Sequence, residues 1–205
     1  MQEDKKNKYR QQQEKEWAEF NHEKAFALLI KATAMLDRAG VPYHLEGGTL
    51  LGLVRDGDLL PWDDDLDISV PSGFALKAYG ALLPLLLKGW RIDKRKWKTV
   101  FKSLAVKGIR IIKVRDRSRG RFRSGRVYLD VLVKKEFEGF CYWQAKGRLM
   151  KVSAKYYDGY DEIEVGTAKF KVPVGYKAYL TEKYGDWSFP VKEWDCGKDE
   201  KTIVE

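Results

Sequence analysis

A short acidic run between residues 61 and 68 contains the side chains best suited to chemistry, because four aspartates follow a Pro–Trp pair there. Asp65 and Asp67 alternate with Leu66 and Ile68. Residues two apart in a strand point to the same face, so we expect the two carboxylates to project together while the apolar side chains enter the core. Paired carboxylates are typical of magnesium sites that act on phosphates. The run therefore predicts a metal site built on Asp65 and Asp67.

The other aspartates of the run, Asp63 and Asp64, lie nearer the Pro–Trp turn, and we expect them to be bystanders or neighbours of the metal ligands. A solvated acidic loop and a calcium-binding turn are the alternative interpretations. An EF-hand loop is excluded, because its glycine and its terminal glutamate are missing. A solvated loop accounts for Asp63 and Asp64, but it leaves the apolar residues that alternate with the later acids unexplained.

A further acid, Asp130, interrupts the apolar stretch 127–133. A bare carboxylate is costly to bury there, so we expect it to face a metal or a cleft. It would act either as a third metal ligand or as the base that accepts the proton of an acceptor hydroxyl. The alternative is an outward-facing acid on a strand edge. The sequence thus predicts Asp65, Asp67 and Asp130 as catalytic residues and as ligands of Mg²⁺ or Mn²⁺.

Gly47 and Gly48 directly precede a short helical pattern. Glycines at a helix start leave backbone N–H groups open to an anion at the positive end of the helix dipole, so we expect this turn to bind phosphate. Thr49 either caps the helix or touches the phosphate, and Arg55 near the helix end is expected to reach it. The alternatives are an ordinary turn for the glycines and a dipole partner for Arg55.

Most of the net charge of +9 lies in one basic segment, because residues 110–126 hold eight Lys and Arg against the single acid Asp116. An arginine occupies every second position from 115 to 123. In an extended chain these guanidinium groups repeat every ~6.6 Å on one face, a spacing suited to successive phosphates. We expect Arg117, Arg119 and Arg121 to bind the phosphate of a donor or an acceptor. A solvated hairpin loop is the alternative.

The elements that must position these residues are a mixture of helices and strands. Helical patterns cover 14–39, 49–55, 74–87 and 174–184, and strand patterns cover 41–45, 65–70, 90–93, 99–106, 109–114 and 127–133, with weaker ones at 137–143, 149–155, 162–165 and 170–172. This order predicts an α+β fold, in which helices flank a mixed sheet. We expect residues 1–13 to form a disordered polar tail and residues 14–205 to form a single catalytic domain.

The composition excludes several classes of protein. Of the 205 residues 44% are hydrophobic, which is enough for one core, and no apolar stretch reaches the roughly 18 residues that span a bilayer. The first residues lack the apolar segment of a secretion signal. Cys141 and Cys196 have no CxxC partner, and His22 and His44 are too few for a histidine metal centre. We expect a cytoplasmic protein, with a peripheral position at a membrane surface as the alternative.

Residues 45–55, followed by residues 60–68, closely resemble the signature of the LicD family. That family includes bacterial phosphocholine transferases and the fukutin-type phosphoribitol transferases. Residues 179–187 resemble its closing helix, and residues 172–174 precede that helix as in the family. The resemblance spans about residues 25–190, with specific ends and a diffuse middle, and the chain is short for the family.

The resemblance implies a nucleotidyltransferase fold and transfer of a substituted phosphate, such as phosphocholine or a phosphopolyol, from a CDP-activated donor to a sugar hydroxyl. The expected acceptor is a glycan or an anionic glycopolymer. The family's paired aspartates and later acid correspond to Asp65, Asp67 and Asp130, which would hold magnesium. One alternative is a nucleotidyltransferase that moves NMP to a small molecule, a protein or RNA. The other is a non-catalytic module that binds nucleic acid or another polyanion, such as an anionic membrane.

Overall fold

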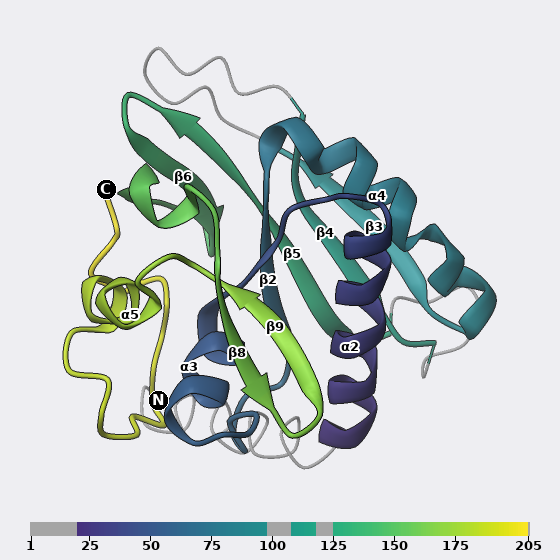
Figure 1. Ribbon diagram of the computed structural model, residues 1–205, viewed down its shortest axis with the longest axis horizontal. Helices are drawn as coiled ribbons and strands as arrows, with labels where there is room; N and C mark the ends of the chain where they lie inside the picture. The colour runs from purple at the N-terminus through teal and green to yellow at the C-terminus, as the bar shows by residue number, and fades with distance from the viewer. Residues whose placement is uncertain (1–19, 98–107, 118–124, 205) are drawn as a thin grey trace, which may run out of the picture.

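Seven strands form the central sheet in the computed structural model, which describes residues 20–97, 108–117 and 125–204 (Figure 1). They are β1 (His44–Leu45), β2 (Leu66–Pro71), β3 (Arg91–Lys96), β4 (Ile109–Arg115), β5 (Val127–Phe137), β6 (Phe140–Ala145) and β7 (Arg148–Ser153). The order across the sheet is β1–β2–β5–β4–β3, and β6 joins β5 to β7. Only β2 and β5 are parallel among these pairs, so the sheet is mixed.

Helices α2 (His22–Arg38) and α4 (Ala75–Leu82) cover one face of this sheet. The described part of the chain also holds the α-helices α3 (Gly47–Arg55) and α5 (Tyr176–Tyr184). Helix α2 packs against β5 and α4 packs against β2 and β4, over apolar side chains such as Ile68, Ile112 and Val131, which are fully buried. Because side chains alternate along a strand, their polar neighbours Asp67, Lys113 and Asp130 face away from these helices. The α+β prediction is confirmed.

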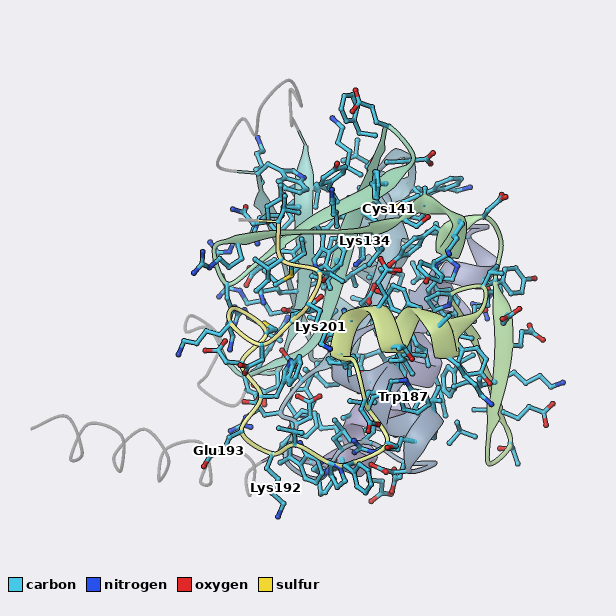
Figure 2. The ribbon with its side chains drawn as sticks, turned by 90° about the vertical axis from the view of Figure 1, so that its left-hand side faces the viewer. Lys134, Cys141, Trp187, Lys192, Glu193 and Lys201 are labelled. Atoms are coloured by element: carbon cyan, nitrogen blue, oxygen red, sulfur yellow. The ribbon has the colours of Figure 1, made fainter. Side chains whose placement is uncertain are left out.

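The remaining described elements are a small hairpin, short 3₁₀ helices and the C-terminal segment. Strands β8 (Asp161–Val165) and β9 (Ala168–Val172) form a separate hairpin. The short 3₁₀ helices are η1 (Ser72–Phe74), η2 (Leu83–Lys88) and η3 (Ala154–Tyr157). Figure 2 shows the C-terminal segment leaving α5 past Trp187, Lys192 and Glu193 before it turns back to Lys201. Its end pairs with β7, where the Lys151 N–H donates to the Thr202 carbonyl.

Several expected elements differ in extent from those observed. The expected helix 74–87 is divided into α4 and η2, because Pro84 has no N–H to continue an α-helix. The helix expected from residue 49 begins at Gly47, so the glycine pair forms its first turn instead of preceding it. Residues 1–13 and the strand expected at 99–106 lie outside the described residues, and the single domain over 14–205 stays a prediction. None of the described helices combines the length and apolar character needed to cross a bilayer.

Candidate metal and phosphate site

Three carboxylates meet on the face of the sheet opposite α2 and α4. Asp67 in β2 and Asp130 in β5 stand at the same register position of two parallel strands. Asp65 comes directly before β2, and one carboxylate oxygen from each of the three lies within 4.8 Å of the others. The structure therefore brings together the three residues that the sequence pattern predicts.

Burial and mutual repulsion dominate the electrostatics of this cluster. Burial, followed by the charges of the neighbouring aspartates, raises the pKa of both Asp65 and Asp67 well above the usual range. Burial also raises the pKa of Asp130, although Lys113 opposes this effect. Asp130 Oδ1 is buried and has no hydrogen-bond partner among the described residues. A purely oxygen donor set with crowded negative charge fits Mg²⁺ or Mn²⁺.

Asp63 lies closer to this centre than expected from the sequence. It can group with Asp64 and Asp65, with oxygens from all three within 4.8 Å of one another. Burial, together with the charge of Asp64, raises the pKa of Asp63 to about 7. Asp63 is therefore a further carboxyl group beside Asp65.

The start of α3 presses directly against these acids. A Cβ atom on Gly47 would lie 2.2 Å from Asp67 Oδ2, and one on Gly48 would lie 1.9 Å from Asp63 Oδ2. Gly47 also has a positive φ of 56°, a conformation that side chains disfavour. Both glycines are therefore needed for the carboxylates to approach the positive end of the helix. A contact between these glycines and phosphate stays a prediction.

Two backbone hydrogen bonds hold Asp67 in place. Its N–H donates to the hydroxyl of Thr49 at 2.8 Å, and its carbonyl accepts from the Glu46 N–H at 3.0 Å. Thr49 is only 2% exposed. Its hydroxyl thus positions Asp67, a role that the sequence pattern did not indicate, and its expected contact with phosphate is untested.

Arg55 lies at the far end of α3, about 12 Å from Gly47 along the helix axis. Its guanidinium donates to Asp56 at 2.8 Å and 2.6 Å and lies 6.0 Å from the centre of the Trp62 ring. Lys192 from the C-terminal segment lies 5.7 Å from the same ring. Arg55 therefore contacts the loop before the acids and is separated from the glycine turn.

The predicted arginine clamp lies largely outside the described residues. Arg117 is exposed at the end of a described range, and Arg119 and Arg121 fall in the segment 118–124, which is not described. Whether these arginines bind phosphate stays a prediction.

A buried charge cluster beneath the glycine turn has no counterpart in the sequence predictions. Glu46 is completely buried, and its two carboxylate oxygens lie 2.9 Å from Lys134 Nζ and 3.1 Å from Lys183 Nζ. The hydroxyls of Tyr157 and Tyr179 also donate to this carboxylate. The cluster thereby joins the start of α3 to β5, η3 and α5.

Opposite charges keep this cluster ionised. Burial alone would raise the pKa of Glu46, but Lys134 and Lys183 override it and hold the pKa well below the usual range. Burial lowers the pKa of Lys134 to about 8 in spite of Glu46. For Lys183, burial is outweighed by Glu200 and Glu46, which raise its pKa. The one sequence signal was the position of Glu46 directly before the glycine pair.

The mixed sheet and its acidic centre define a protein of the nucleotidyltransferase-like class. A profile of the family described as LicD/FKTN/FKRP, nucleotidyltransferase domain, matches residues 40–174. The chain belongs to this family, and the resemblance drawn from its motifs is confirmed.

Individual relatives match over shorter segments. Ribitol 5-phosphate transferase FKRP of Homo sapiens is 56% identical over 36 residues, 18% of this chain and 7% of that protein. Lipopolysaccharide cholinephosphotransferase LicD of Haemophilus influenzae is 46% identical over 35 residues, 17% of this chain and 13% of that protein. The uncharacterized protein RT0683 of Rickettsia typhi is 35% identical over 79 residues, 37% of this chain and 26% of that protein. The aligned segments thus cover a minor part of each relative.

Among solved structures, ANT(2")-Ia in complex with adenylyl-2"-tobramycin aligns with a TM-score of 0.45 and 14% identity. The alignment covers 83% of this chain and 81% of that one. A likeness of this strength says nothing about the site.

Proposed function

We propose that this protein transfers a substituted phosphate from a CDP-linked donor to a hydroxyl group of a glycan, with Mg²⁺ or Mn²⁺ as cofactor. The observation that carries the proposal is the convergence of Asp65, Asp67 and Asp130, whose oxygens lie within 4.8 Å of one another beside the start of α3. Membership of a family whose relatives are named as ribitol-phosphate and choline-phosphate transferases supports the same class of reaction.

The three aspartates would hold the metal, which supplies positive charge for the phosphates and the leaving group. The acceptor oxygen attacks the phosphorus of the transferred phosphate group, so that a new P–O bond forms while the P–O bond to CMP breaks and CMP leaves. The hydroxyl proton leaves to solvent or to a nearby base. Asp130 is better suited to hold the metal than to accept this proton, because Lys113 already pairs with one of its oxygens.

The direct test is turnover by Asp65→Asn and Asp67→Asn variants, with Asp58→Asn as a matched control. Asp58 is exposed and lies before the acidic run, so its variant should keep full activity. Loss of turnover in both site variants, with unchanged thermal unfolding, is the expected result. Full activity in either site variant would overturn the proposal.

The donor can be identified by a thermal-shift screen of CDP-choline, CDP-ribitol and CDP-glycerol, each with and without magnesium. A stabilisation that requires the metal and is lost in Asp65→Asn supports the proposal and selects the donor. Mass spectrometry then identifies the products. Release of CMP is expected, whereas release of pyrophosphate from a nucleoside triphosphate would show NMP transfer instead.

A further inference from the structure

A row of charged side chains continues from the carboxylate cluster across the sheet. Asp67 is in register with Asp130, Asp130 with Lys113, and Lys113 with Asp93, so the row crosses β2, β5, β4 and β3. Lys113 and Asp130 form an ion pair. Because each residue occupies the same pleat position, all of them face the side of the sheet that carries the predicted metal ligands.

Basic side chains surround this row on β3 and β4. We call them the basic strip: Arg91, Arg95, Arg110, Lys113 and Arg115. Arg91 and Arg115 share Asp93 at 3.1 Å and 3.2 Å. The strip has five cations against the two carboxylates of Asp93 and Asp130, and therefore a net positive charge.

Arg110 is turned toward the strip by a break in the strand register. Arg95 pairs with Ile111 and Lys96 pairs with Ile109, which leaves Arg110 unpaired between them. An irregularity of this kind re-aims a side chain. The Arg110 guanidinium donates to the Gln144 carbonyl at 2.8 Å, whereas its Nε is buried and has no hydrogen-bond partner in the described chain. Arg110 thus has a guanidinium donor that no described residue engages.

The strip and the glycine turn lie on opposite sides of the carboxylates. Helix α3 meets Asp67 and Asp63 through Gly47 and Gly48, and β1 flanks β2 on that side. The basic strip lies on β4 and β3, on the other side of β5. In phosphoryl transfer the attacking and leaving oxygens are roughly in line, so donor and acceptor approach from opposite sides. If the donor phosphates lie at the glycine turn, the acceptor lies over the strip.

We infer that the basic strip is an acceptor subsite that binds a phosphate group carried by the acceptor, so that the acceptor is an anionic glycopolymer instead of a neutral glycan. This inference rests on the proposed function. Arginine forks suit bidentate recognition of phosphate, and Arg95 and Arg110 have no acidic partner among the described ion pairs. Lys113 connects the subsite to the reaction centre through Asp130.

The test measures binding of two probes, separately from turnover. The first probe is a fluorescent oligomer of glycerol phosphate without a donor, and the second is CDP with magnesium. Arg110→Gln should weaken binding of the oligomer by about tenfold and leave CDP binding unchanged. Arg95→Gln, at an exposed position, should also weaken it and is the variant least able to disturb folding.

Lys94→Gln is the matched control, because it removes one charge from the same strand but on the helix-covered face. Lys94 lies 4.4 Å from the centre of the Tyr79 ring of α4. Its variant should bind both probes as the unmodified protein does. An equal loss of oligomer binding in Lys94→Gln and Arg110→Gln would show that general surface charge binds the oligomer, and it would overturn the subsite.

Asp65→Asn separates this inference from the proposed function. It should abolish magnesium-dependent CDP binding and leave oligomer binding intact. Unchanged CDP binding in this variant would count against the proposed function alone. The subsite is overturned if Arg110→Gln weakens only CDP binding, if a neutral oligosaccharide binds as tightly as the oligomer, or if single-stranded RNA of equal charge binds more tightly.

Discussion

Asp67 and Asp130 occupy the same register position in two adjacent parallel strands, β2 and β5. This relationship places two carboxylates, which lie far apart in the chain, next to each other on one face of the sheet. Their mutual repulsion is opposed on one side by Lys113 and on the other by the start of α3. The geometry of the candidate site therefore depends on the pairing of these two strands.

Asp130→Asn should weaken metal binding at least about tenfold, by analogy with the effect of removing groups that orient metal ligands. The substitution removes the charge that faces the cluster while keeping the shape of the side chain. Titration with Mn²⁺, followed by electron paramagnetic resonance, measures the affinity. Asp93→Asn is the control from the same row, since Asp93 pairs with Arg91 and Arg115. Equal affinities for the unmodified protein and Asp130→Asn would show that Asp130 is not a ligand.

Gly47→Ala should abolish activity and lower the stability of the protein. The added methyl group would meet Asp67 Oδ2 at 2.2 Å, and the positive φ of 56° adds backbone strain of order 1 kcal/mol. Gly73→Ala is the control, because nothing lies within 4 Å of a Cβ there and its φ is not positive. Turnover and thermal unfolding of both variants test the prediction, and a fully active Gly47→Ala would contradict it.

Thr49→Val should destabilise the protein by about 1–3 kcal/mol, because the partly buried N–H of Asp67 loses its acceptor. It should also reduce turnover by loosening Asp67. Thr33→Val is the matched control: its hydroxyl is equally buried but donates to the Leu29 carbonyl within α2, far from the acids in the fold. Chemical denaturation measures the stability of both variants, and an activity assay measures their turnover. If the two variants lose equal stability and equal activity, the positioning role of Thr49 is wrong.

Glu46→Gln should cost about 3–5 kcal/mol of unfolding free energy at neutral pH, since it leaves Lys134 and Lys183 buried without their partner. The contribution of Glu46 should disappear in acid. Its pKa in the folded protein is depressed below the ordinary value of 4.5, so its stabilisation is complete above that value and is lost as the pH falls through the folded value.

Denaturation at pH 7 and pH 3 therefore checks the role of Glu46. The difference between the unmodified protein and Glu46→Gln should shrink at pH 3. Glu164→Gln removes a glutamate from the exposed pair with Lys169 and should leave the unfolding midpoint unchanged at both pH values. A difference that is the same at pH 7 and pH 3 would contradict the sign of the pKa shift.

The pairing of Asp65 with Asp67 was predictable from sequence, because it depends only on the alternation of side chains along one strand. The pattern of acids and apolar residues indicated that Asp65 and Asp67 lie together, and the apolar surroundings of Asp130 indicated a special environment. The register that places Asp130 beside Asp67 was not predictable in this way, because β2 and β5 pair across the chain segment that forms α4, β3 and β4.

The buried cluster around Glu46 was missed for a related reason. Its partners come from β5, η3 and α5, and no short spacing connects them. The break between α4 and η2 is different, since Pro84 was visible in the sequence. The apolar run on both sides of Pro84 favours one continuous helix, but the missing N–H of the proline divides it.

The parallel pairing of β2 with β5 also has a consequence for how the protein folds. Parallel neighbours require a long crossover, so the pairing of β2 with β5 closes a large loop. The entropy cost of closing this loop arises before the contacts between the two strands can stabilise the chain. The carboxylates cannot meet until that step is complete. A chain truncated before residue 127 would lack β5, the partner strand of β2. Affinity for a divalent ion should therefore arise late during refolding, together with the final cooperative transition.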